Sequence, residues 1–383
     1  MTKYALLLYF SSGMSVVAIK RGSFHSLSIV PFIKKNVVMV IAFVLALVTS
    51  LIVPPDREYL SYFDYKTLTC LFCVLSVVCA LKDINFFYLI AKKIVHIFSN
   101  TRASILALVY ITFIGSMLIA NDMALLTFLP LGALVLTTTK KEKYMAFTFI
   151  MQNIAANLGG MLTPFGNPQN LYLYSKFNIP NGEFVSIMAP PFILSVVLIT
   201  ISCLIFVKKE GLEIEDEKID VDPLKTTILL LLFAFSIVIV FRIVPYVLGL
   251  IIIPFALFFI DKKALKEVDY PLLLTFVFFF IFAGNMGRMD GVRVFFSSLL
   301  NKDVLIFSSL SCQVISNVPS AILLSQFTSN YRELLLGVNI GGVGTIIASL
   351  ASLITFREYS HHFPKKKGEY LLEFSLFNFS FLS

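Results

Sequence analysis

The string NLGGMLTPFGNPQN, residues 157–170, interrupts a long apolar run that extends over residues 144–177. In hydrocarbon an unpaired backbone amide costs several kcal/mol, so a broken helix persists there only when it is buried in protein or lines a cavity. Glycine, proline and asparagine at such depth therefore indicate a site between membrane helices. A related string, NIGGVGT, follows at residues 339–345 within the apolar run 304–356.

The composition around these strings requires a lipid environment. Of 383 residues, 58% are hydrophobic and 14% are charged, whereas a soluble chain has about 45–50% apolar and about 25% charged residues. This excess excludes a soluble enzyme, a secreted disulfide scaffold and a disordered regulator. The five cysteines all lie in apolar runs, where packing is their expected role. We predict an all-α polytopic membrane protein.

Uninterrupted apolar runs give the positions of the membrane helices, each of which needs about 20 residues. The runs that qualify cover residues 36–54, 66–81, 184–207, 226–241, 243–260 and 270–286. Residues 1–35 form an N-terminal extension in which residues 4–19 are either an extra membrane helix or a signal peptide. Residues 369–383 are apolar but short, so we expect either a half-crossing helix or a truncated sequence.

The distribution of basic residues predicts the orientation. The net charge of +8 comes from lysine and arginine clusters at the ends of apolar runs, which is the positive-inside pattern and not a nucleic-acid surface. Residues 101–139 have basic residues at both ends, so they form either a re-entrant hairpin with Asn121 and Asp122 at its tip or two full crossings. Residues 84–98 are predicted to be an interfacial amphipathic helix. The acidic segment 208–225 is expected to be a solvated cytoplasmic linker.

The two halves of the chain repeat the same order of elements. The sequence Phe63-Asp64-Tyr65 corresponds to Val268-Asp269-Tyr270, Asn121 corresponds to Asn317, and the string at 157–163 corresponds to that at 339–345. This register places Gly166-Asn167 on Ala348-Ser349. Counting spans gives opposite orientations for the repeats, residues 36–207 and 226–383. Inverted repeats with re-entrant hairpins and discontinuous helices are typical of secondary transporters, with the site at the midplane.

The interrupted segments also carry motifs of a known group. The strings TPFGNPQN (163–170), SNVPS (316–320) and NIGGVGT (339–345) resemble the citrate-transporter-like anion permeases of the ion transporter superfamily. That group includes sodium/dicarboxylate symporters, arsenite permeases and Na⁺/H⁺ antiporters. In its dicarboxylate branch the hairpin tips read Ser-Asn-Thr and bind substrate carboxylate and sodium. Here the first tip, Ala120-Asn121-Asp122, resembles arsenite permeases instead.

The residue types at the breaks suit both ions of a coupled transporter. An asparagine offers a carbonyl to a cation and an amide to an anion, helix N-termini attract anions, and freed carbonyls coordinate Na⁺. Na⁺ is expected at Asn121, Asp122 and Asn317. The candidate substrate and ion ligands are Asn121, Asp122, Thr163, Gly166, Asn167, Asn170, Ser316, Asn317, Ser320, Asn339, Thr345 and Ser349.

Asp122 and several glycines and prolines receive separate interpretations. An acidic residue in the centre of an apolar run is functional by default, so Asp122 is either the coupling residue or a cap of the helix that follows it. Gly159, Gly160, Gly341 and Gly342 are expected to permit close helix approach. Pro168 and Pro319 are expected to terminate half-helices.

We therefore expect a secondary active transporter that moves a small anion, a carboxylate or an inorganic oxyanion, by alternating access and is coupled to Na⁺ or H⁺. The alternatives are a cation/proton antiporter, an arsenite-type permease and, with less support, an anion channel. An enzyme is not expected, because the four histidines lie at membrane edges or in loops. No cofactor is expected beyond the coupling ion. The expected partners are a small anion and the lipid bilayer of a bacterial-type cytoplasmic membrane, with formation of a homodimer left open.

Overall fold

The structure, a computed structural model, describes residues 36–98, 100–211 and 222–383. Within these ranges the chain is helical and contains no strand, apart from one isolated bridge between Asn100 and Gly211. The prediction of an all-α protein is confirmed. The predicted helix at residues 4–19 lies outside the described residues.

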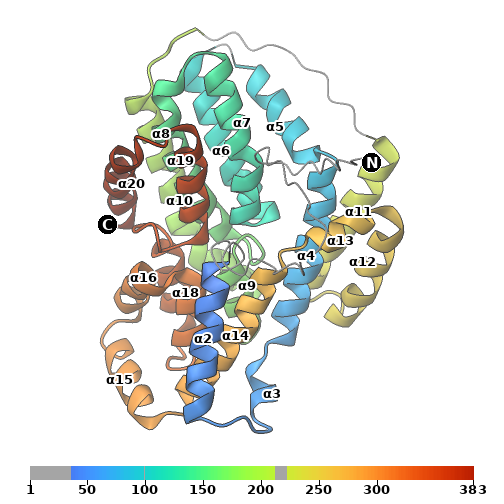
Figure 1. The fold of residues 1–383 in the computed structure, drawn as a ribbon, viewed down its shortest axis with the longest axis vertical. Coiled ribbons are helices and arrows are strands. Elements are labelled where there is room, and N and C mark those ends of the chain that lie inside the picture. Colours follow the sequence, from blue (N-terminus) through green and yellow to red (C-terminus); the bar gives the residue numbers. More distant parts are fainter. Residues whose placement is uncertain (1–35, 99, 212–221) are drawn as a thin grey trace, which may run out of the picture.

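The first repeat runs from the blue helix to the green helices of Figure 1 and contains two interrupted elements. Its helices are α2 (Val37–Ile52), α3 (Tyr59–Tyr62), α4 (Tyr65–Asp83), α5 (Phe86–His96), α6 (Thr101–Ile119), α7 (Asn121–Thr138), the 3-10 turn η1 (Glu142–Tyr144), α8 (Met145–Gly159), the 3-10 turn η2 (Gly160–Leu162), α9 (Pro168–Lys176) and α10 (Asn181–Phe206).

The second repeat has the same order of elements. Its helices are α11 (Pro223–Val240), α12 (Tyr246–Ile260), α13 (Lys262–Glu267), α14 (Tyr270–Gly287), α15 (Asp290–Leu300), α16 (Val304–Ile315), α17 (Asn317–Leu324), α18 (Tyr331–Ile340), α19 (Leu350–His362) and α20 (Lys367–Leu382). All six predicted spans fall on helices. Among the described residues, the six helices long and apolar enough to cross a membrane are α4, α6, α7, α10, α11 and α14.

The two halves are inverted. The α6–α7 hairpin extends from one end of the molecule to its middle, whereas α16 and α17 reach the middle from the opposite end (Figure 1). The broken elements α8–α9 and α18–α19 run through the same level. Residues 101–139 form a hairpin in the structure, and Asn121 at its tip is buried in the middle of the molecule; whether the hairpin re-enters the membrane stays a prediction.

The two repeats interlock through apolar helices that precede the hairpin of each repeat. Helix α2 packs along α14 of the other repeat, and α12 packs along α4. Asn285 of α14 donates from its side-chain amide to the Thr49 hydroxyl of α2, at 3.2 Å. On the other side, a Cβ placed on Gly249 of α12 would lie 3.3 Å from Cys73 Sγ of α4. Because each repeat holds a helix of the other, neither half packs independently.

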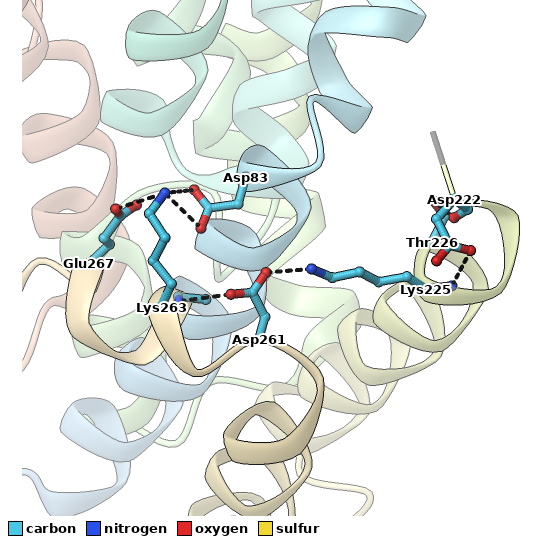
Figure 2. A network of polar contacts seen from close by, with 8 residues as sticks. Asp83, Asp222, Lys225, Thr226, Asp261, Lys263 and Glu267 are labelled. Atoms are coloured by element: carbon cyan, nitrogen blue, oxygen red, sulfur yellow. Dashed lines mark hydrogen bonds and ion pairs between the residues drawn. The ribbon is translucent and has the colours of Figure 1, made fainter. Parts of the chain in front are cut away.

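Ion pairs connect the two repeats at both ends of helices α4 and α14. Figure 2 shows one end, where Lys263 of α13 pairs with Asp83, the last residue of α4, at 3.5 Å. Close by, Lys225 of α11 pairs with Asp261 at 2.8 Å. At the other end, Arg288 after α14 pairs with Asp56 before α4 at 2.7 Å. The C-terminus of α4 is thus paired with the segment that precedes α14, and the C-terminus of α14 is paired with the segment that precedes α4.

Two details differ from the sequence predictions. The linker is not wholly solvated at its start, because the Glu210 carbonyl accepts from Thr101 N–H at 2.8 Å and its carboxylate pairs with Lys143 at 2.7 Å. The prolines begin half-helices and do not terminate them. Pro168 is the first residue of α9 and Pro319 lies in the first turn of α17, where a missing N–H leaves no hydrogen bond unmade.

Candidate substrate and ion site

The two hairpin tips have the same geometry and the same partner. Ala120 and Ser316 turn the chain between the arms with φ of 68° and 75°. The next residue in each hairpin donates its backbone N–H to the broken helix of its own repeat: Asn121 to Gly166 O at 3.0 Å and Asn317 to Ala348 O at 2.9 Å. The predicted register between the repeats is confirmed, since Gly166 and Ala348 were matched by it.

The threonines and glycines of the repeated strings brace each hairpin. Thr163 donates its hydroxyl to Met117 O at 2.7 Å, and Thr345 donates to Gln313 O at 3.0 Å. Both carbonyls lie in the last turn of a first hairpin arm. A Cβ on Gly159 would lie 2.3 Å from Phe113 O, so the helices could not approach as they do. The expected role of this glycine in close packing is confirmed.

Buried amide side chains join the two broken helices at the centre. Asn339 Oδ1 accepts from Asn167 Nδ2 at 3.1 Å and from Gln169 Nε2 at 3.3 Å. Asn339 Nδ2 donates to Asn170 Oδ1 at 2.6 Å. Asn339 belongs to the second repeat and its partners belong to the first, so this cluster connects the repeats where both are interrupted. We call it the asparagine cluster, comprising Asn157, Asn167, Gln169, Asn170 and Asn339.

Asn157 brings the hairpin tips to this cluster. Its Oδ1 accepts from Asn121 Nδ2 at 3.4 Å, and its backbone carbonyl accepts from Asn167 Nδ2 at 3.1 Å. A Cβ on Gly342 would lie 3.1 Å from Asn317 Nδ2 and 3.6 Å from Asn157 Oδ1. Sequence reasoning did not select Asn157 as a ligand, although it heads the repeated string in the position equivalent to Asn339.

Two acceptors in the cluster have no partner. Asn167 Oδ1 and Gln169 Oε1 are buried and accept no hydrogen bond from the described part of the chain. Leaving a polar atom buried and unpaired costs roughly 1–3 kcal/mol. Such atoms are therefore available to a ligand that supplies a cation or a donor.

The remaining predicted ligands lie around the cluster with partners of their own. Asn170 Nδ2 donates to three backbone carbonyls of the broken helix, Gly160, Met161 and Thr163. Ser316 donates to Ala348 O at 3.3 Å. Ser320 shares a hydrogen bond with Ser311 at 2.9 Å between the arms of the second hairpin, and Ser349 shares one with Ser352 at 3.0 Å.

Asp122 points elsewhere. Its Oδ1 is buried and accepts no hydrogen bond from any described residue. The side chain that accepts a backbone N–H in the first turn of α7 is that of Asn121, which binds the Asp122 N–H at 2.9 Å. The interpretation of Asp122 as a helix cap is therefore wrong. The residue lines a cavity of about 50 Å³ together with Asp269 at the start of α14.

Helix ends of both polarities meet around the cluster. Helices α7, α9, α17 and α19 begin at the two hairpin tips and after the two breaks, and α6, α8, α16 and α18 end there. Free N–H groups and the positive ends of helix dipoles favour an anion, whereas unpaired carbonyls at C-terminal ends favour a cation. The centre therefore suits a pair of opposite charges.

Comparison with known proteins identifies the family of the chain. The family model for citrate transporters matches residues 16–331. The chain belongs to the citrate transporter family. It is 34% identical over 318 residues to the uncharacterized transporter MJ0456 of Methanocaldococcus jannaschii, covering 82% of this chain and 86% of that protein.

A second relative is the inner membrane protein YbiR of Escherichia coli, 27% identical over 315 residues and covering 79% of this chain and 82% of that protein. The predicted resemblance to citrate-transporter-like permeases is confirmed by these matches. This member of the citrate transporter family is a multi-pass membrane transporter. Neither relative's name states a substrate.

Proposed function

We propose that the protein is a secondary active transporter of the cytoplasmic membrane that moves a small anion together with Na⁺ or H⁺. The observation that carries this proposal is the meeting of two inverted hairpin tips at one asparagine cluster. Asn121 and Asn317 bind equivalent carbonyls of the two broken helices, and the cluster retains buried acceptors without partners. Two such acceptors, Asn167 Oδ1 and Gln169 Oε1, lie side by side in the chain segment that bonds to Asn339 of the other repeat, and this supports a ligand at the junction.

The anion is a carboxylate or an inorganic oxyanion. Side-chain amides and the first N–H groups of half-helices are donors that recognise anionic oxygen. Of the residues that form the asparagine cluster, none is basic, so the anion is held by dipoles and amides. Such a site releases its ligand more readily than a buried ion pair does, because no counter-charge is left unpaired.

Asp122 provides the reason for coupling. Its backbone N–H donates to Asn121 Oδ1 at 2.9 Å, so the carboxylate is one residue from the hairpin tip. A negative charge there repels an arriving anion, and a proton or a cation bound beside it removes the repulsion. Binding of the two ions is therefore mutually favourable, which is the thermodynamic requirement for symport.

The inverted symmetry supports transport by alternating access. Each hairpin reaches the site from its own end of the molecule (Figure 1), so either can become the barrier while the other opens. Because the two repeats have the same contacts at their hairpin tips, the transporter can adopt two arrangements. In one the first hairpin closes the site and the second opens it, and in the other their roles are exchanged.

An arsenite-type permease is the second candidate, because the first tip, Ala120-Asn121-Asp122, resembles that group. The resemblance is confined to the first tip, since the position equivalent to Asp122 in the second tip is Val318. The test is counterflow in proteoliposomes preloaded with citrate, other di- and tricarboxylates, sulfate or arsenite. The proposal expects saturable exchange of at least one carboxylate or oxyanion. Exchange of arsenite alone favours the second candidate, and an ion current without counterflow identifies a channel.

A further inference from the structure

In each repeat one side-chain amide binds carbonyls that the helix break sets free, but the two amides come from different elements. The last carbonyls of a helix have no backbone donor within it. In the first repeat, Asn170 Nδ2 donates to three carbonyls of residues 160–163, and Asn170 belongs to α9, the second half of the same broken helix. In the second repeat, Gln313 Nε2 donates to Gly341 O at 2.8 Å and to Val343 O at 3.2 Å. Gln313 belongs to α16, the first arm of the second hairpin.

The inverted symmetry does not account for Gln313. The equivalent residue of the first hairpin is Met117, since each lies four residues before the asparagine of its tip and each accepts a threonine hydroxyl at its backbone carbonyl. A methionine side chain has no hydrogen-bond donor. In the other direction, Asn170 corresponds to Ser352, whose hydroxyl shares a hydrogen bond with Ser349 at 3.0 Å. Each repeat therefore has the donor that the other lacks.

Gln313 also binds the chain beyond those carbonyls. Its Oε1 accepts the Thr345 N–H at 2.8 Å, so one side chain holds backbone groups at both ends of residues 341–345. These partners fix the orientation of the amide, because Nε2 can only donate and Oε1 can only accept. Gly344 lies between them with a φ of 126°, and a Cβ at this position would overlap Gln313 Oε1. Glycine is therefore required for the contact.

This contact lies next to the asparagine cluster. Helices α16 and α18 pack side by side (Figure 1). Asn339, the member of the cluster from the second repeat, is in the last turn of α18, and Gly341 follows that helix. Because Gln313 holds the buried Gly341 and Val343, a displacement of α16 would leave their carbonyls unpaired and disturb the end of α18. In the first repeat, a displacement of α6 leaves Asn170 with its carbonyls, because they belong to one broken helix.

We propose that Gln313 is a positioning residue of the transport site. It holds the second break, and with it Asn339, in the arrangement that binds the anion, and it does so only while the second hairpin is in place against α18. Closure of this hairpin and binding of the anion therefore favour each other. Met117 provides no such link for the first hairpin. The inference rests on the proposed function, because it names a residue that adjusts the same site.

The contact itself is tested without any transported substrate. Hydrogen exchange is measured by mass spectrometry on the full-length protein in nanodiscs. Gln313→Met removes both polar groups and introduces the residue of the first repeat. We expect peptides that cover residues 341–346 to lose protection, and peptides that cover residues 160–166 to exchange as in wild type. Gln326→Met is the matched control and should exchange as wild type throughout, because Gln326 donates to Ile322 O one turn earlier in its own chain segment, at 3.4 Å.

The role in the site is tested by counterflow in proteoliposomes with citrate, other di- and tricarboxylates, sulfate and arsenite. For whichever of these the wild type exchanges, Gln313→Met should raise KM about tenfold, which is the net contribution of about one hydrogen bond. Vmax should change by less than about twofold, and Gln326→Met should keep the wild-type KM. If Gln313→Met does not elute as a monodisperse peak in detergent, Gln313→Glu takes its place. It keeps the acceptor for Thr345 but loses the donor for the two carbonyls, so faster exchange at residues 341–346 and the same rise in KM are expected.

Each contrary result overturns a defined part. Wild-type hydrogen exchange at residues 341–346 in the folded Gln313 variant means that this side chain does not hold the second break. Faster hydrogen exchange with an unchanged KM means that its role is structural and that it does not position the site. Failure of the wild type to exchange any of these anions rejects the proposed function and the transport role of Gln313 with it, and hydrogen exchange then still decides whether Gln313 holds the break.

Discussion

Asn121 and Asn317 occupy the same position in two oppositely oriented hairpins, and each donates its backbone N–H to the broken helix of its own repeat, at 3.0 Å and 2.9 Å. A residue with positive φ precedes each of them. Because these contacts are made by backbone atoms, the tips are positioned independently of their side chains. The side-chain amides make separate contacts, among them Asn121 Nδ2 to Asn157 Oδ1 at 3.4 Å, so an exchange of these partners for a ligand does not require the tip to move.

The inversion of the hairpins is tested by cysteine accessibility. Lys140→Cys lies at the base of the first hairpin and Lys302→Cys precedes the second, and both native residues are exposed. The five native cysteines are buried, so their background labelling is low. An impermeant maleimide is expected to reach Lys140→Cys from the cytoplasmic side and Lys302→Cys from the opposite side. Labelling of both from one side contradicts the inverted topology.

Asp122→Asn is expected to separate binding from coupling. The amide keeps the size of the side chain but removes the charge that repels an anion. We predict that substrate still shifts the Tm of the variant, while uptake no longer responds to an imposed pH or sodium gradient. Asp290→Asn, on the exposed start of α15, is the control. A gradient response equal to wild type in Asp122→Asn would leave the residue without a coupling role.

The pairing of Glu210 at the base of the first hairpin predicts a pH-dependent stability. Hydrogen bonds from Lys141, Lys143 and Tyr144 lower the pKa of Glu210 from 4.5 to about 2. Because the folded pKa is the lower one, the stabilisation is complete above about 4.5 and is lost as the pH falls towards 2. Glu210→Gln should lower the Tm at pH 7, and the difference from wild type should shrink in acid.

The control for this measurement is Glu142→Gln. Glu142 is exposed in the neighbouring turn, so its replacement should leave the Tm close to wild type. A Tm difference for Glu210→Gln that stays constant from neutral to acid pH would show that the ion pairs do not contribute.

Close packing at the helix break is tested with two glycines. A Cβ on Gly159 would lie 2.3 Å from Phe113 O, whereas a Cβ on Gly182 would meet nothing within 4 Å. Gly159→Ala should therefore destabilise the protein by about 1–3 kcal/mol, measured as a lower Tm. Gly182→Ala in α10 should be neutral or stabilising by up to about 1 kcal/mol. Equal Tm values for the two variants would exclude the tight contact.

The sequence was sufficient to predict the positions of the membrane helices, because each one is a local run of apolar residues. Apolar runs located every predicted span, and the repeated strings located both breaks. The packing of α2 and α12 against helices of the other repeat was not predictable. Both helices are apolar, and their apolar patterns do not depend on which helix they pack against. The pairing of α2 with α14 depends on contacts such as Asn285 to Thr49 at 3.2 Å, which no local pattern encodes.

For the candidate site, the sequence predicted a set of ligands but not the contact that each one makes. Asn121, Asn167, Asn317 and Asn339 all lie around the two helix breaks, and their role as ligands stays a prediction. Thr163 and Thr345, by contrast, bond to hairpin carbonyls. A threonine in a broken helix has the same appearance in a sequence whether its hydroxyl binds a ligand or a backbone. The sequence also did not indicate that Asp122 and Asp269 line one cavity, because the two residues lie far apart in the chain.

The central claim, that Asn121 and Asn317 form one transport site, is tested most directly by counterflow with Asn121→Ala and Asn317→Ala. Asn285→Ala is the matched control, because Asn285 is also a buried asparagine with hydrogen bonds but lies between α2 and α14. In proteoliposomes, using whichever anion the wild type exchanges, both tip variants should lose counterflow and Asn285→Ala should retain it. Near-normal exchange by either folded tip variant would contradict the claim.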